Sequence, residues 1–230
     1  MRRFQKYRAF TLVELLAAVA IIGILGGILF TALGSARQSA QQAACLSNMR
    51  QLAGAVHLHC TEHGGEFPRS NHSAFGYGER NWLWEIQPYL AADEPQNTAE
   101  FNDVMARHCR CPMDERESGS SYGLNVYFEV AQNERQFDEY REAPQNWRTL
   151  ARIRQPESTI LLAELKTEAS ADHVMAHFWA GDGTGFEVST ERHQGKSHYA
   201  FVDGHVELLP VEAVFAPAEG IDRWHPEGAR

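Results

Sequence analysis

The sequence predicts an α+β fold, with one long N-terminal helix packed on a small, mainly antiparallel β-sheet domain. Residues 10–62 contain no proline and are rich in residues that favour helix. Later runs of β-branched and aromatic residues end in two strands joined by Asp203 and Gly204, a preferred hairpin turn. The 230 residues leave room for one ordinary domain beyond the helix.

The first half of the helix has the composition of a membrane anchor. Residues 15–36 carry no charge, which is long enough to span about 30 Å of hydrocarbon. Residues 2–9 hold four cations and no acid, which keeps the N-terminus cytoplasmic. A secretory signal peptide would have a shorter apolar region, about 7–15 residues. The expected organisation is a cytoplasmic leader (1–9), a transmembrane half-helix (10–36), a soluble half-helix (37–63) and an extracytoplasmic α+β domain (64–230).

Glu14 is the costliest residue of the anchor. A carboxylate in hydrocarbon costs about 2.5–3.5 kcal/mol on insertion scales, so it requires a partner. Cleavage of the chain before Phe10 would create a cation, the new amine, close to it in sequence. A plain signal anchor with a stray acid is the alternative, and it leaves Glu14 unexplained.

One string near the N-terminus is Ala9-Phe10-Thr11-Leu12-Val13-Glu14-Leu15-Leu16. It resembles the cleavage and methylation site of type IV pilins and type II secretion pseudopilins. The resemblance implies a pilin-like fold and a prepilin peptidase that cuts between Ala9 and Phe10 and methylates the Phe10 amine. It also implies that Glu14 neutralises the amine of a neighbouring subunit during assembly. One residue departs from the family pattern, because Ala9 stands where Gly is usual.

The remaining elements follow in order. Gly64, Gly65 and Pro68 should end the long helix near Glu62. A short helix is expected over residues 81–90, stopping near Pro88. Strands are expected over 121–130, 158–164 and 173–179, followed by the hairpin of residues 198–209. The polar stretches 93–100 and 131–147 are expected to be loops.

A second resemblance covers the C-terminal half. The sequence contains His193, then nine intervening residues, then Asp203-Gly204. This pattern is similar to the processing-associated H-x(9)-DG module of bacterial prepilin-like proteins. Matching strings are Cys111-Pro-Met-Asp114, Ser121-Tyr-Gly-Leu-Asn125 and Ile160-Leu-Leu-Ala-Glu164. The resemblance implies architecture and location rather than an activity.

Three roles of this module are consistent with its residues. Asp203 can set a tight turn while His193 hydrogen-bonds within the sheet. The module can instead bind an ion, with Asp203, Glu164 and Asp114 as oxygen donors for calcium. A His–carboxylate pair can also act as a general base, but no nucleophile motif accompanies it. We expect the structural role, no catalytic residue and no resident metal or cofactor, with calcium the one ion considered.

Histidines and cysteines gather at the end of the long helix. His59 and His63 are four residues apart and share a helix face, with His57 and Cys60 beside them. Such residues can ligate a metal, but a fourth ligand is unassigned, and a solvated helix end is the expectation. The four cysteines are Cys45, Cys60, Cys109 and Cys111. Cys45 and Cys60 lie about 22 Å apart on a continuous helix, whereas Cys109 and Cys111 lie at most about 7 Å apart in extended chain. Two simultaneous helix-to-strand disulfides are therefore excluded, and one disulfide or none remains possible.

The charge and motifs define the expected function. The formal net charge is −9, and loss of the leader's four cations makes it about −13, which argues against nucleic-acid binding. The reading is a non-enzymatic, single-pass subunit of the bacterial inner membrane, with its C-terminal domain periplasmic or extracellular. Its expected partners are the prepilin peptidase, the membrane and other pilin-like subunits or copies of itself. A non-polymerising membrane-anchored binding module and a membrane-tethered hydrolase are the alternatives.

Overall fold

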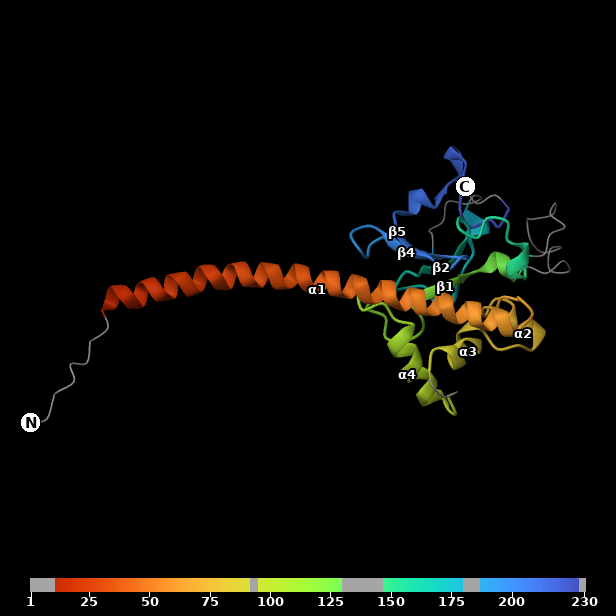
Figure 1. Cartoon of the computed structure of the whole chain (residues 1–230), viewed down its shortest axis with the longest axis horizontal. Helices are drawn as coiled ribbons and strands as arrows, with labels where there is room; N and C mark the ends of the chain where they lie inside the picture. Colours follow the sequence, from red (N-terminus) through yellow and green to blue (C-terminus); the bar gives the residue numbers. More distant parts are fainter. Residues whose placement is uncertain (1–10, 92–94, 130–146, 180–186, 228–230) are drawn as a thin grey trace, which may run out of the picture. The chain divides into compact units, whose positions relative to one another are not determined.

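The computed structural model describes residues 11–91, 95–129, 147–179 and 187–227. Its first element is α1 (Leu12–Glu62), one continuous helix, as the proline-free sequence predicts (Figure 1). The helix ends where expected. Gly64 and Gly65 adopt positive φ angles of 66° and 89°, and the Gly65 amide donates to the Cys60 carbonyl at 2.7 Å. The chain divides into two compact units, Met1–Gln41 and Gln42–Arg230.

The second unit contains a five-stranded sheet with the order β3-β1-β2-β4-β5. Its strands are β1 (Tyr122–Asn125), β2 (Ile160–Glu164), β3 (His173–Val174), β4 (Ser197–Phe201) and β5 (Val206–Leu209). Strands β1, β2, β4 and β5 are labelled in Figure 1. The pairs β1–β2, β2–β4 and β4–β5 are antiparallel, and β3 joins β1 in parallel. A second sheet pairs β6 (Phe215–Ala216) with β7 (Ile221–Asp222). The prediction of a mainly antiparallel α+β domain is confirmed.

The central strand β2 is buried along its whole length. A strand covered on both faces reads as a continuous apolar run, which is why Ile160-Leu-Leu-Ala163 shows no alternation. Glu164 closes this run and is also buried, with 0 % exposure. The central strand therefore carries a carboxylate into the core.

The soluble half of α1 packs into the same core as the sheet. Met49, Leu52 and Val56 are fully buried and follow the spacing of one helix face. They share one apolar cluster with Leu124 of β1 and Tyr199 of β4. Burial of each such side chain stabilises the fold by about 1.5–3 kcal/mol.

Within the described residues, three α-helices follow α1: α2 (Ala74–Tyr77), α3 (Trp82–Glu85) and α4 (Thr98–His108). The helix predicted over residues 81–90 is α3 followed by a 3₁₀ turn, Gln87–Tyr89. The loop predicted over residues 93–100 is wrong at its end, because α4 begins at Thr98. The Asn97 side chain accepts from the Glu100 amide at 3.0 Å and donates to the Glu100 carboxylate at 2.8 Å, which caps the helix.

Two predicted strands are shorter than expected. The strand expected over residues 121–130 stops at Asn125, whose side chain accepts from the Tyr127 amide at 3.1 Å and starts a 3₁₀ turn. The strand expected over residues 173–179 stops at Val174, and Ala176–Phe178 form another 3₁₀ turn. At the end of β1, this side-chain bond of Asn125 to the backbone competes with ladder pairing. Residues 131–146 of the second predicted loop lie outside the described residues.

Candidate functional site

The first residues of α1 form a capping box. The Thr11 amide and hydroxyl both lie 2.8 Å from the Glu14 Oε2 atom, and the Glu14 amide lies 3.3 Å from the Thr11 hydroxyl. This reciprocal bonding satisfies helix-end donors that have no partner within the helix. The sequence carries the signal for this motif, Thr-x-x-Glu, at residues 11–14, a signal that the charge of Glu14 does not by itself reveal. Ala9 and Phe10, the expected cleavage residues, lie outside the described residues.

The N-terminal half of α1 presents apolar side chains to its surroundings. An 18-residue window of this helix has a mean hydropathy of 2.6, and none of it is buried. The large apolar side chains are exposed on all sides, and examples are Leu16, Ile22 and Phe30. A helix that is apolar all round has the composition of a membrane span.

The histidine of the C-terminal module lies inside the domain, against the end of β2. The His193 Nε2 atom lies 3.0 Å from Oε1 of Glu164, and the Nδ1 atom of His198 lies 3.3 Å from the same oxygen. The second carboxylate oxygen accepts from the His198 amide at 3.0 Å. Burial alone raises the pKa of Glu164, but the hydrogen bonds from His193 and His198 outweigh it and lower the pKa to about 2. Glu164 is therefore a buried, ionised carboxylate held by two imidazoles.

Asp203 does not take part in this cluster. It lies in the turn between β4 and β5, where its Oδ1 atom accepts from the His205 amide at 3.0 Å and contacts the His205 ring at 2.6 Å. Gly204 follows with φ 94°, a conformation that favours glycine. Asp203 therefore lies in the turn where the sequence analysis expected it, while His193 bonds to Glu164 of β2 and not to Asp203.

One disulfide connects α1 to the segment that follows α4. Cys45 of the helix is bonded to Cys111, so one of the two alternatives left by the sequence is realised. The Cys111 sulfur lies 3.5 Å from the His193 Nε2 atom. Cys60 and Cys109 are free, and burial raises the pKa of each thiol to about 12. Both thiols are therefore protonated at neutral pH and poor nucleophiles, which weakens the hydrolase alternative.

A second buried charge cluster adjoins His193. The Oδ2 atom of Asp114 lies 2.6 Å from Nε of Arg116 and 2.5 Å from Nη1 of Arg192. Its Oδ1 atom accepts a hydrogen bond from the Thr167 hydroxyl at 2.7 Å. Burial raises the pKa of Asp114, but these hydrogen bonds and charges lower it well below its ordinary value. Asp114, Glu164 and Asp203, the oxygen donors considered for calcium, thus have three different sets of partners.

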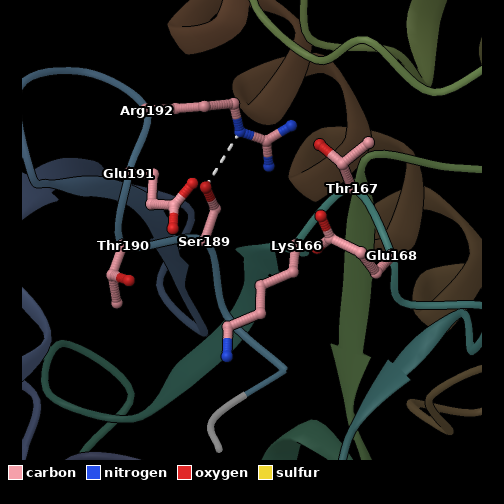
Figure 2. Close-up of a pocket in the computed structure, with 7 residues that line it drawn as sticks. All are labelled: Lys166, Thr167, Glu168, Ser189, Thr190, Glu191 and Arg192. Carbon is pink, nitrogen blue, oxygen red and sulfur yellow. Dashed lines mark hydrogen bonds between the residues drawn. The ribbon is translucent and has the colours of Figure 1, made fainter.

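The surface beside this cluster contains a small cavity of about 70 Å³. Figure 2 shows the Arg192 side chain beside Ser189, whose hydroxyl accepts from the Arg192 Nε atom at 3.0 Å. The Lys166 ammonium points away from Arg192 in the same view. Because Arg192 is already committed to Asp114 and Ser189, this cavity offers no guanidinium for an anionic ligand.

The helix end differs from the solvated end that was expected. His59 and Cys60 are buried, whereas His63 is exposed and His57 is half-buried. The expectation is wrong for the two buried residues. Residues beyond the helix cover them: the Glu85 backbone carbonyl of α3 hydrogen-bonds to the His59 ring.

Residues 4–30 match the family model described as the prokaryotic N-terminal methylation motif. The match supports a type IV pilin-like prepilin, and this motif is typical of structural rather than enzymatic proteins. No curated protein and no solved structure matches the chain.

Proposed function

We propose that this chain is a prepilin-type structural subunit that is cleaved before Phe10, methylated on the new amine and assembled into a pilus or pseudopilus-like filament or a secretion complex. The observation that carries the proposal is the methylation motif of residues 4–30, placed at the start of an exposed helix without charges from residue 15 to 36. A prepilin peptidase, the membrane and further pilin-like subunits are its partners.

Assembly provides a partner for Glu14. In the single subunit the carboxylate accepts two bonds from Thr11, which are neutral and leave its charge uncompensated. The amine of Phe10 on a neighbouring subunit supplies a positive charge at the same depth of the membrane. Any other register between neighbouring helices leaves both charges unpaired in hydrocarbon, so the pair selects one register.

The disulfide supports an extracytoplasmic place for the folded domain. Disulfides persist in the periplasm and outside the cell and are rare in the cytoplasm. Cys45 and Cys111 both lie beyond the apolar half of α1. With the four cations of residues 2–9 held on the cytoplasmic side, the domain lies on the opposite side of the inner membrane.

The test is in-membrane crosslinking through a photoreactive residue at Leu16, comparing the wild-type chain with Glu14→Gln. The variant keeps the size and hydrogen-bonding capacity of the side chain but removes its charge. We expect it to insert, to be cleaved and to lose subunit–subunit crosslinks. Glu115→Gln, which removes a charge from an exposed position of the domain, is the matched control and should crosslink like wild type. Equal crosslinking of Glu14→Gln would show that subunits associate without the Glu14 charge, and a wild-type chain without crosslinks would favour the non-polymerising anchored module.

A further inference from the structure

The end of α1 holds a second group of ligand-type side chains, which assembly does not use. His59 and His63 on α1 and Glu85 on α3 each place one ligand atom within 4.8 Å of the other two. The imidazole rings are stacked, with centroids 3.9 Å apart and planes 10° apart. The two histidines lie on one face of α1 because they are four residues apart. The carboxylate of Glu85 comes from a different helix, α3.

Backbone carbonyls orient both imidazoles. The His63 Nδ1 atom lies 2.8 Å from the His59 carbonyl oxygen, which leaves the Nε2 lone pair of His63 available. The His59 ring bonds to the Glu85 carbonyl, while its Nδ1 atom is buried without a hydrogen-bond partner. Histidines that ligate metals characteristically donate their other ring N–H to a carbonyl or carboxylate, which fixes the tautomer. An unsatisfied buried nitrogen is costly, and a metal bond would satisfy it.

We propose that His59, His63 and Glu85 form a binding site for a divalent transition metal, with Zn²⁺ the best match. Two imidazoles and one carboxylate form a ligand set that zinc accepts, with the fourth position left to water or an anion. The three side chains line a pocket of about 300 Å³, which gives that fourth ligand room.

The charges around the pocket are compatible with a cation. Two of its arginines already face carboxylates: Arg148 lies 3.5 Å from Glu66, and Arg69 lies 3.1 Å from Glu79.

The test uses the full chain in detergent micelles, with the Cys45–Cys111 disulfide intact and metal removed by a chelator. Zn²⁺ titration should show one equivalent bound per chain and a rise in the thermal unfolding midpoint. His63→Gln and Glu85→Gln should each weaken Zn²⁺ binding at least about tenfold. His63 is exposed, so its variant should fold normally, as circular dichroism of the metal-free chain will check. His57→Gln, on the same helix but outside the three-residue group, is the matched control and should bind like wild type.

Co²⁺ as a spectroscopic probe separates this site from the cysteines. A site of two imidazoles and one carboxylate gives visible d–d bands without the thiolate charge-transfer band of cysteine ligation. Equal Zn²⁺ affinity in wild type, His63→Gln and Glu85→Gln would overturn the proposal, as would a thiolate band or the absence of binding.

Discussion

The Nε2 atom of His193 lies 3.0 Å from Oε1 of Glu164, and both side chains are completely buried. The pair connects the loop before β4 to the end of β2, the central strand. A His198 ring shares the same carboxylate oxygen. The histidine of the C-terminal module therefore holds a charged core contact, while Asp203 shapes a surface turn.

Removal of the Glu164 charge should destabilise the domain. Glu164→Gln replaces a buried carboxylate, which bonds to the His193 ring and the His198 amide, with a neutral amide, and a hydrogen bond to a charged group contributes about 1.5–3 kcal/mol. Urea unfolding of the full chain in micelles at pH 7 measures this cost. Glu157→Gln, an exposed glutamate close to β2 in sequence, is the control and should change the free energy of unfolding by less than about 0.5 kcal/mol.

The same pair gives a pH dependence. Hydrogen bonds from His193 and His198 overcome the effect of burial and hold the pKa of Glu164 at about 2, below the value of about 4.3 in an unfolded chain. Its stabilisation is present above pH 4–5 and decreases as the pH falls toward 2. The difference in free energy of unfolding between wild type and Glu164→Gln should narrow over that range. A difference that stays constant from pH 7 to pH 2.5 would contradict the assigned ionisation.

The disulfide should contribute through the unfolded chain. Cys45 and Cys111 are separated by 66 residues, and closing a loop of that length stabilises a fold by up to about 4 kcal/mol. The double variant Cys45→Ala/Cys111→Ala should therefore unfold at lower urea concentration. Thiol titration of the denatured wild-type chain should find two thiols before reduction, Cys60 and Cys109, and four after it. Four thiols before reduction would refute the bond.

Gly123 should tolerate no side chain. A Cβ atom at this position of β1 would lie 2.7 Å from the Leu165 side chain and 3.2 Å from the His173 backbone. Overpacking of this kind costs about 1–3 kcal/mol, so Gly123→Ala should lower the free energy of unfolding by that amount. Gly76→Ala, in helix α2 with no atom within 4 Å of the new Cβ, is the matched control. Equal stability of the two variants would contradict the β1–β3 packing.

Periodicity and turn chemistry predicted the long helix and the hairpin, because these features depend on neighbours in sequence. The end of α1 is determined by Gly64 and Gly65, and the turn is determined by Asp203 and Gly204. Helix α4 was missed although its cap, Asn97 with Glu100, is also a local signal. The composition of that segment, polar at its start, suggested a loop instead.

The candidate sites depend on contacts between residues distant in sequence, so only some of their members could be identified from the sequence. Cys45 could not be assigned to Cys111 because the choice depends on how β1 and its preceding loop lie against α1. Glu164 was recognised as part of a motif string, but its bond to His193 requires the register of β2 and β4. Glu85 joined the two helix-end histidines only through the fold of α3 over α1.

Cleavage between Ala9 and Phe10 is the earliest step of the proposed function. The methylation motif spans this bond, and Ala9 stands where the resembling family usually has Gly. We expect a larger side chain before the cut to slow cleavage by the peptidase. Ala9→Gly should therefore be cleaved faster than wild type, and the bulkier Ala9→Val should resist cleavage. Co-expression with a prepilin peptidase, followed by intact mass and N-terminal sequencing, should show loss of nine residues and an N-methylated Phe10.

The Glu14→Gln chain separates processing from assembly in the same experiment. It keeps Ala9 and Phe10, so we expect wild-type cleavage together with lost crosslinking. An unshifted wild-type mass, under conditions that fully cleave a control prepilin, would count against processing. The Phe10 amine would then never form, and Glu14 would have no cation to pair with at that depth of the membrane. Crosslinking of such an uncleaved chain would require a different source of subunit contact, so the two readouts together decide whether the charge pair drives assembly.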